Sequence, residues 1–307
     1  MQPETKSSQS VLIFGAGKAG EAAILKYQNS NNIIAILDNE PAKHNKEFCG
    51  YKVVSPSEIH HLTFDKVFIA SEYFEQIYAQ LCNELGVAQE KVQILDARDI
   101  KPLHFASSES VKLHAEAVLA TASIFFIENQ LVHYVDAGTL LGIIRDGELI
   151  PWDDDIDFAV HAVDLKRLLP LLPGLTNMLE KETGFPWTFE LLYSPVAYHA
   201  IAVGDIRSVK VHCALADAKL PAIDLFVKYI AGDGMYFTLA SRGLKMPGHF
   251  IDNTSVKTFK NMEVVVPTEA ESYLSLHYGE DWRIPKRDWN LSMLNNATAY
   301  VSGNGSE

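Results

Sequence analysis

The chain has 307 residues, of which 48% are hydrophobic and 21% are charged, and its formal net charge is −13 at pH 7. This composition is typical of globular proteins, and the length predicts two domains. The negative charge argues against binding to nucleic acid or anionic lipid, although a metal ion can still attract an anionic substrate locally. No apolar run approaches the length of a membrane span, and the start of the chain lacks the pattern of a signal peptide. We therefore expect a cytoplasmic protein with no membrane span, and a homo-oligomer is compatible with these features.

The first hundred residues alternate apolar runs with helix-like segments. Strands that alternate with helices predict a parallel sheet with crossover connections, so residues 1–105 are expected to form a small α/β domain of Rossmann-like type. The expected strands are Val11–Phe14, Ile33–Leu37, Val67–Ala70 and Val92–Leu95, and the expected helices are Glu21–Tyr27 and Tyr73–Leu85.

A glycine loop follows the first expected strand. Gly15, Gly17 and Gly20 fit the dinucleotide-binding fingerprint, and Asp38 ends the next strand, where a ribose-binding acid belongs. The alternative is that these glycines only allow tight packing of strand against helix. No hydride-transfer residues accompany the loop, and the domain resembles small Rossmann-like heads attached to polysaccharide-biosynthesis enzymes. We therefore expect nucleotide or nucleotide-sugar binding, regulation or assembly, and not redox catalysis.

The second expected domain covers residues 106–307. Its first segment, Ser110–Glu128, places apolar residues at steps of four and three, which predicts a helix with one buried face. From Val132 onward, strands and helices mix without a repeated strand–helix rhythm, so an α+β fold is expected. The residues that define the helical face are Val111, Ala115, Val118, Ala122 and Phe125.

Carboxylates are concentrated between Asp136 and Asp157. Asp155 and Asp157 flank a single isoleucine in a segment that alternates like a half-buried strand. Side chains two apart on a strand point to the same face, with Cα atoms ~6.6 Å apart at about 3.3 Å per residue. Two carboxylates so placed can bind one hard cation, and Mg²⁺ carrying a phosphate suits such oxygen ligands. The pair therefore predicts a metal–phosphate site.

A third carboxylate, Asp224, stands within the apolar run Ala222–Ile230. An aspartate there is costly to bury unless it binds a metal or is paired, so a metal ligand, a salt bridge to a neighbouring lysine and an edge position are the alternatives. Asp153 follows a turn at Pro151 and is expected to cap or to support the ligands. Asp154 is expected to point away and to be structural.

Four further residues are candidates for phosphate contacts. Gly138 and Thr139 form either a plain turn or a place where backbone amides approach a phosphate closely. Arg145 is either a surface residue or a bidentate phosphate clamp. Lys245 is the first of several basic residues to test as a substrate contact.

The motifs of this region resemble those of the LicD/fukutin family of phosphotransferases, which have a nucleotidyltransferase fold. The matching segments lie between residues 110 and 290 and are Gly-Thr-Leu-Leu-Gly, Arg-Asp-Gly, Ile-Pro-Trp-Asp-Asp-Asp-Ile-Asp, Pro-Thr-Glu-Ala-Glu-Ser-Tyr-Leu and Tyr-Gly-Glu-Asp-Trp. The zinc-binding insertion of some animal members is not evident, because Cys49, Cys82 and Cys213 lack metal-ligand spacing. A bacterial-type enzyme of capsule or lipopolysaccharide modification is the nearer comparison.

The resemblance implies transfer of a phosphorylated alcohol from a CDP-linked donor to a glycan hydroxyl, with release of CMP. The transferred group would be of the phosphocholine, ribitol phosphate or glycerol phosphate type. By motif, Asp155, Asp157 and Asp224 would hold Mg²⁺, or Mn²⁺ in its place, and form the catalytic set. Gly138, Thr139 and Arg145 would contact the donor phosphates, and the N-terminal domain would bind a nucleotide.

Two other functions remain open at this point. A true nucleotidyltransferase would move NMP from an NTP and release pyrophosphate. A nucleotide-sensing module would bind through its N-terminal domain and keep only a vestigial acidic centre. The intact carboxylate set argues against the second alternative, because clustered acids repel one another unless a cation offsets them.

Overall fold

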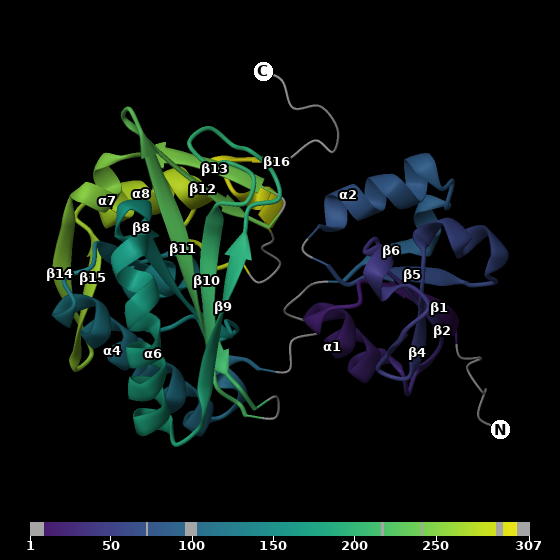
Figure 1. The fold of residues 1–307 in the computed structure, drawn as a ribbon, viewed down its shortest axis with the longest axis horizontal. Helices are drawn as coiled ribbons and strands as arrows, with labels where there is room; N and C mark the ends of the chain where they lie inside the picture. Colours follow the sequence, from purple (N-terminus) through teal and green to yellow (C-terminus); the bar gives the residue numbers. More distant parts are fainter. Residues whose placement is uncertain are drawn as a thin grey trace. The chain divides into compact units, whose positions relative to one another are not determined.

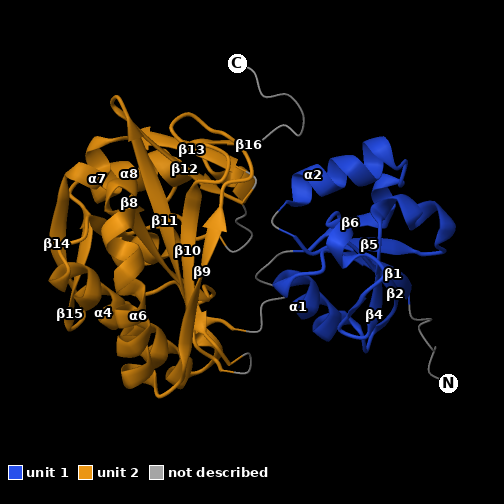
Figure 2. Ribbon diagram, in the orientation of Figure 1, with its two compact units in different colours: residues 1–102, 301–303 blue, residues 103–300, 304–307 orange. Residues whose placement is uncertain are grey.

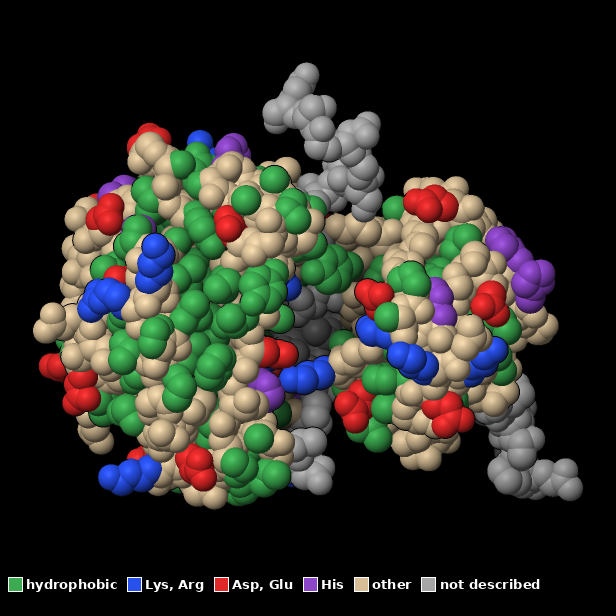
Figure 3. Space-filling model, in the orientation of Figure 1, with side chains coloured by type: hydrophobic (Ala, Val, Ile, Leu, Met, Phe, Trp, Pro, Cys, Tyr) green, Lys and Arg blue, Asp and Glu red, His purple; other side chains and the backbone are tan. Residues whose placement is uncertain are grey.

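The computed structural model describes residues 9–71, 73–95, 103–215, 218–240, 242–286 and 291–299. The chain divides into two compact units, Met1–Pro102 and Leu103–Tyr300 (Figures 1 and 2). The boundary expected from the sequence lies three residues further along the chain. On the face shown in Figure 3, basic and acidic side chains are interspersed within each unit.

Unit 1 is built on a six-stranded sheet of order β3-β4-β2-β1-β5-β6, in which every neighbouring pair except β3 and β4 is parallel. Because β2 and β5 lie on opposite sides of β1, the strand order reverses at the end of β1, where the glycine loop begins. The strands are β1 (Gln9–Phe14), β2 (Asn31–Leu37), β3 (Glu47–Phe48), β4 (Tyr51–Val54), β5 (Lys66–Ile69) and β6 (Val92–Ile94).

Both faces of this sheet are buried, which explains why its strands read as continuous apolar runs. Val11 and Ile13 pack with helix α1 (Lys18–Tyr27) on one face. Leu12 and Phe14 pack on the other face with helix α2 (Phe74–Ala79), which continues as a π-helical turn, Gln80–Glu84. The four expected strands and the α/β class are confirmed, whereas the short strands β3 and β4 were not expected.

Unit 2 contains an eight-stranded mixed sheet and a separate two-stranded sheet, β14 (Thr254–Phe259) with β15 (Met262–Pro267). In the large sheet the order β16-β13-β12-β11-β10-β9 is antiparallel throughout, while β8 pairs with β11 in parallel and β7 adds to β8. Its strands are β7 (His133–Val135), β8 (Asp155–His161), β9 (Trp187–Tyr193), β10 (Ile206–Cys213), β11 (Ala222–Ala231), β12 (Gly234–Leu239), β13 (Arg242–Pro247) and β16 (Ala297–Ala299).

Two long helices of unit 2 pack against its large sheet. Helices α4 (Glu109–Glu128) and α6 (Leu165–Thr183) pack against each other and against β8 and β9 (Figure 1). The rings of Phe126 on α4 and Phe158 on β8 lie 5.1 Å apart, so α4 covers the face on which Phe158 points. The remaining helices are α5 (Ala137–Arg145), α7 (His249–Asp252) and α8 (Ala270–Tyr278).

Helix α4 confirms one expectation and corrects another. The predicted face is buried in the core of the unit, with Val111, Ala115 and Val118 no more than 1% exposed. By length and composition alone, however, α4 could cross a membrane, so the expectation that no apolar run approaches that length was wrong. Half of its apolar window is buried inside the unit, and core helices pass the same test.

Candidate metal and phosphate site

The acidic centre is assembled by the parallel pairing of β8 with β11. Asp157 lies beside Asp224 and Asp155 lies beside Ala222 in this pairing, so all three aspartates point to the same face of the sheet. One carboxylate oxygen from each lies within 4.8 Å of the others. The structure therefore brings together three carboxylates from two strands that are about seventy residues apart in sequence.

The electrostatics of this centre favour a bound cation. Asp157 is only 6% exposed. Its pKa is raised well above the ordinary value, first by burial and then by the charges of Asp155, Asp153, Asp224 and Asp136. Without a cation the cluster must hold a proton or bear the repulsion. A hard divalent ion with oxygen ligands would remove both penalties, so these residues fit Mg²⁺ or Mn²⁺.

Asp153 and Asp154 form the other edge of the centre. Oxygens of Asp153, Asp154 and Asp155 also lie within 4.8 Å of one another. The expectation that Asp154 points away was wrong, because β8 begins only at Asp155 and strand alternation does not apply before it. Asp153 is placed as expected, after the turn and beside the ligands.

Gly138 lies against these carboxylates. A Cβ atom at this position would come within 2.3 Å of Asp153 Oδ2 and 3.6 Å of Asp157 Oδ2. Any larger residue would therefore push into the acidic centre. The preceding Ala137 holds a positive φ of 43°, a strained conformation for alanine, so the surrounding structure must enforce this turn.

Gly138 and Thr139 are not a plain turn but the first turn of α5, which is capped by Asp136. The Thr139 hydroxyl is buried and accepts a hydrogen bond of 2.9 Å from the backbone N–H of Asp157. Thr139 therefore positions β8. Because the first N–H groups of a helix have no partner within the helix, the start of α5 offers amide donors beside the acidic centre.

The sequence did not predict a buried ion pair between Lys228 and Asp136. Lys228 on β11 is fully buried, and its Nζ lies 2.7 Å from Asp136 Oδ2 and 3.1 Å from the centre of the Phe237 ring. The Tyr273 hydroxyl donates to Asp136 Oδ1 at 2.6 Å. Burial alone would raise the pKa of Asp136, but the charge of Lys228 and the hydrogen bonds from Lys228 and Tyr273 lower it. The rule that singled out Asp224, a charge within an apolar strand, could also have found Lys228.

Lys210 on β10 borders the centre and was also missed. Its Nζ lies 3.0 Å and 2.9 Å from the two oxygens of Asp224, which it faces across the β10–β11 pairing. The salt bridge considered as an alternative for Asp224 is therefore present. It does not exclude the metal site, because the Asp224 carboxylate also reaches Asp155 and Asp157.

The structure does not bring Arg145 and Lys245 to the carboxylates as direct neighbours. Arg145 ends α5 and makes a bidentate contact with Asp146, at 2.9 Å and 2.7 Å. In the strand pairing, Lys245 on β13 lies opposite Tyr236 on β12, and Tyr236 lies opposite Tyr229 on β11. Tyr229 is an odd number of residues from Asp224, so its side chain points to the other face of the sheet. The strand register therefore places Lys245 on the other face of the sheet from the acidic centre.

Two buried histidines of unit 2 are structural. Burial lowers the pKa of His133 and of His277 to about 4 in each case. His133 stacks on Phe126 at 4.9 Å, and its Nδ1 lies 2.7 Å from the Leu131 carbonyl oxygen. Both rings are therefore neutral at pH 7 and belong to the core.

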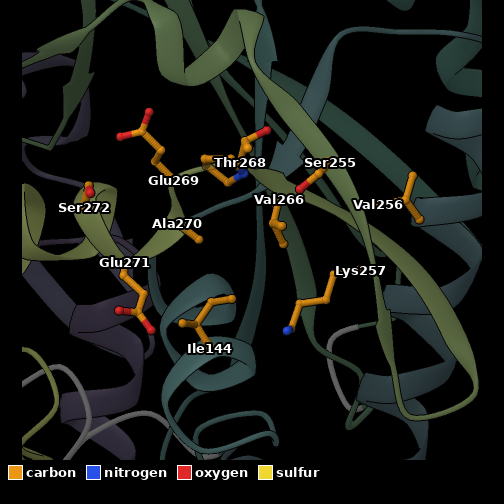
Figure 4. A pocket seen from close by; sticks show the side chains of 11 residues that line it. Ile144, Ser255, Val256, Lys257, Val266, Thr268, Glu269, Ala270, Glu271 and Ser272 are labelled. Carbon is orange, nitrogen blue, oxygen red and sulfur yellow. The ribbon is translucent and has the colours of Figure 1, made fainter.

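An open groove of about 550 Å³ lies between the β14–β15 hairpin, the last turn of α5 and the start of α8. Figure 4 shows Glu269, Glu271 and Ser272 on one side of it and Lys257 on the other. Ile144, which lines the groove, is six residues along α5 from Gly138, or ~9 Å at 1.5 Å per residue. None of the acidic-centre residues lines this groove.

The N-terminal glycine loop has an internal explanation. Gly15 adopts a φ of 120°, and a Cβ atom on Gly20 would come within 1.8 Å of the Gly15 carbonyl oxygen. These two glycines therefore permit the close contact of β1 with α1, as the packing alternative holds. Gly17, the N-cap of α1, has nothing within 4 Å of its Cβ position and is open.

Asp38 fixes this loop through internal contacts. Its Oδ2 accepts from the Ala16 amide at 2.8 Å and from Lys43 Nζ at 3.0 Å, and its Oδ1 accepts from the Glu40 amide at 2.8 Å. Burial would raise the pKa of Asp38, but these donors lower it below the ordinary value. Both carboxylate oxygens expected to bind a ribose are thus already used within the unit.

Comparison with known families agrees with the resemblance seen in the motifs. Residues 130–269 match the family model described as LicD/FKTN/FKRP, nucleotidyltransferase domain, and residues 7–93 match C2185-like, N-terminal. The C-terminal unit therefore carries a domain of the LicD/FKTN/FKRP family.

Among curated proteins, the chain is 26% identical over 201 residues to ribitol-5-phosphate transferase FKTN of Homo sapiens. That match covers 64% of this chain but only 38% of the relative. An uncharacterized protein of Rickettsia prowazekii is 20% identical over 209 residues, which cover 66% of this chain and 68% of the relative.

Solved structures give weaker likenesses. ANT(2″)-Ia in complex with adenylyl-2″-tobramycin covers 60% of this chain and 83% of its own, at 16% identity and a TM-score of 0.30. UDP-D-quinovosamine 4-dehydrogenase from Vibrio fischeri covers 29% of this chain and 80% of its own, at 24% identity and a TM-score of 0.25. At such TM-scores neither likeness bears on the fold.

Proposed function

We propose that this protein is a Mg²⁺-dependent phosphotransferase of nucleotidyltransferase fold. It would transfer a phosphorylated alcohol from a CDP-linked donor to a glycan hydroxyl and release CMP. The observation that carries the proposal is the convergence of Asp155, Asp157 and Asp224 within a LicD-family domain. The ribitol-5-phosphate transferases among its relatives support ribitol phosphate as the transferred group, with phosphocholine and glycerol phosphate as alternatives.

The three aspartates would hold the metal ion, and Asp153 would stand beside it. When bound, the ion supplies charge neutralisation on the donor phosphates. The close approach of Gly138 to the carboxylates leaves the start of α5 within reach of the same phosphates, so its amides can bind and orient them. Arg145 would have to leave Asp146 to reach the donor, and Lys245 has no part in this arrangement.

The chemistry is an in-line displacement at the phosphorus that carries the alcohol. The acceptor oxygen forms a bond to this phosphorus, the bond to the CMP oxygen breaks, and a carboxylate of the centre takes the hydroxyl proton. Holding the acceptor and the donor in line supplies most of the rate. We propose a surface polysaccharide, of a capsule or a lipopolysaccharide, as the acceptor and the cytoplasm as the place of reaction.

For unit 1 we propose binding of a nucleotide or nucleotide-sugar at the glycine loop. The loop lies where the strand order reverses, which is the usual ligand position in open α/β sheets, and Gly17 leaves room beside the start of α1. Since Asp38 is held by internal donors, the ligand would be bound mainly through its phosphates.

The test is a product assay with Mg²⁺, a glycan acceptor and CDP-ribitol, CDP-choline or CDP-glycerol. We expect CMP release that depends on the metal, and a loss of at least about 1,000-fold in Asp155→Asn, which is ~4 kcal/mol of lost transition-state stabilisation. Glu182→Gln, an exposed position on α6, is the matched control and should keep full activity.

The same assay separates the alternative. Release of pyrophosphate from CTP or ATP, without CMP from any CDP-alcohol, would replace the proposal by a nucleotidyltransferase that moves NMP. Unchanged turnover in Asp155→Asn would refute both, because both need the same metal ligands.

A further inference from the structure

We infer that Lys210 is a counterion of the acidic centre that releases one oxygen of Asp224 to the metal ion and then binds a phosphate of the donor. The inference rests on the proposed function and adds a substrate-binding residue to it. No sequence motif of the region pointed to Lys210.

The geometry ties Lys210 to the centre. Lys210 lies directly opposite Asp224 in the antiparallel pairing of β10 with β11, so its side chain shares the face of Asp155 and Asp157. Its Nζ contacts both oxygens of Asp224, at 3.0 Å and 2.9 Å. Without a metal ion, this ammonium is therefore a partner of both oxygens of the Asp224 carboxylate.

The pair is placed where it can rearrange. The side chains of Lys210 and Asp224 are 25% and 16% exposed, in contrast to the sealed pair of Lys228 and Asp136, at 0% and 2%. A lysine carries three donors on a flexible stem, so it can keep a contact with one Asp224 oxygen while the other oxygen binds a metal ion. The ammonium would then stand next to the ligands of that ion.

Charge counting shows what Lys210 would contribute. The three carboxylates proposed as metal ligands carry −3, a divalent ion brings the sum for this ligand set to −1, and Lys210 brings it to 0, with Asp153 and Asp154 adding further negative charge at the edge. A pyrophosphate linkage then adds −2, which the centre accepts more readily with the positive charge of Lys210 than without it. Lys210 should therefore weaken binding of the metal alone and strengthen binding of the anionic donor.

These opposite effects define the experiment. Mn²⁺ is titrated by calorimetry into full-length wild type, Lys210→Met and Lys210→Arg, and CDP is then titrated at saturating Mn²⁺. We expect Lys210→Met to bind Mn²⁺ about 3- to 10-fold more tightly and CDP about 10-fold more weakly, since charge-assisted contacts are among the stronger hydrogen bonds. Lys210→Arg should recover most of the CDP affinity. Lys257→Met, an exposed lysine on β14, is the matched control and should change neither affinity.

A lysine with a purely structural role would leave both affinities unchanged or weaken both. Either result in Lys210→Met, with native tryptophan fluorescence, overturns the inference. A second variant, Lys210→Met with Asp224→Asn, should lose the gain in Mn²⁺ affinity, because that gain depends on the freed Asp224 carboxylate. If wild type fails to bind Mn²⁺ at all, the proposed metal centre fails as well. If wild type binds Mn²⁺ and CDP and Lys210→Met matches it, only the role of Lys210 fails.

Discussion

Each unit of this protein brings glycine-containing backbone close to an aspartate, but the two aspartates are used in opposite ways. In unit 1 the loop between Gly15 and Gly20 is held by Asp38, whose oxygens accept from two amides and a lysine. In unit 2, Gly138 approaches Asp157, whose surroundings are other carboxylates. The pKa of Asp38 is lowered and that of Asp157 is raised.

The difference shows why the pattern of glycine and acid does not identify a ligand site by itself. A carboxylate whose oxygens already have donors stabilises the fold and gains little from a new partner. A carboxylate crowded by like charges destabilises the fold until a cation arrives. Asp136 in unit 2 resembles Asp38, because its oxygens also have donors that lower its pKa. It lies next to the turn that carries Gly138, so unit 2 contains both a carboxylate with donors and a carboxylate crowded by like charges.

The largest expected loss of stability comes from removing the cation that pairs with Asp136 in unit 2. Lys228→Met leaves Asp136 buried without its cation, and removal of one partner of a buried pair costs about 3–5 kcal/mol. Urea unfolding followed by tryptophan fluorescence measures this, because all four tryptophans, Trp152, Trp187, Trp282 and Trp289, lie beyond residue 102.

The double variant Lys228→Met with Asp136→Asn removes both charges and is the control. It should lose less stability than Lys228→Met alone. A loss in the single variant that is no greater than in the double variant would show that the charge of Asp136 is not what Lys228 stabilises.

The second prediction concerns Asp38 of unit 1, whose carboxylate oxygens already accept hydrogen bonds. Asp38→Asn puts an amide where amide donors and Lys43 now meet a carboxylate, which should cost unit 1 about 1–3 kcal/mol. Hydrogen exchange followed by mass spectrometry on the segment 9–20 should show faster exchange, by about 10-fold for each 1.4 kcal/mol of lost stability. Lys43→Met removes only a half-exposed salt bridge and should cost less than about 1 kcal/mol. Equal exchange in the two variants would mean that the backbone donors to Asp38 are unimportant.

These comparisons also show what the sequence could predict. The period of a strand placed Asp155 and Asp157 on one face, and a lone charge in an apolar run marked Asp224, because both rules depend on local spacing. Lys210, in contrast, reaches Asp224 only through the pairing of β10 with β11, and pairing between distant strands is not written in local spacing. The same reason explains why Lys245, expected as a substrate contact, does not lie beside the acidic centre. The face of the sheet on which it lies is set by the pairing of β13 with β12 and of β12 with β11.

Other differences arise at the ends of elements. Asp154 was assigned by strand alternation, but the strand starts one residue later, and side chains before it are placed by the turn. Gly138 and Thr139 were given a plain turn as one alternative, whereas they form the first turn of α5, and the Thr139 hydroxyl accepts a hydrogen bond from the Asp157 amide. Boundaries of elements depend on long-range packing, so residues next to them are the hardest to assign from sequence.

The smallest expected effect concerns Asp157, the carboxylate crowded by like charges, and it is measured as thermal stability and not as turnover. Because the pKa of Asp157 is raised in the folded state, this carboxyl group keeps its proton to a higher pH in the folded protein than in the unfolded chain. Without metal, the contribution of Asp157 to stability should therefore fall as the pH rises from about 4 through its raised pKa, whereas Asp157→Asn has no such loss. The lowered pKa values of His133 and His277 act in the opposite direction but equally in both proteins, so the difference between the two proteins reports on Asp157. At pH 7.5 the variant should melt about 2–4 °C higher than wild type, the shift that ~1 kcal/mol produces in a domain of this size. Near pH 4 the two should melt together, and in saturating Mg²⁺ the order should reverse, since only wild type keeps the full ligand set.

Asp233→Asn, at an exposed position between β11 and β12, is the control and should follow wild type throughout. A gap between Asp157→Asn and wild type that does not grow with pH would show that Asp157 is satisfied within the fold, as Asp38 is, and that the contrast between the two units does not hold.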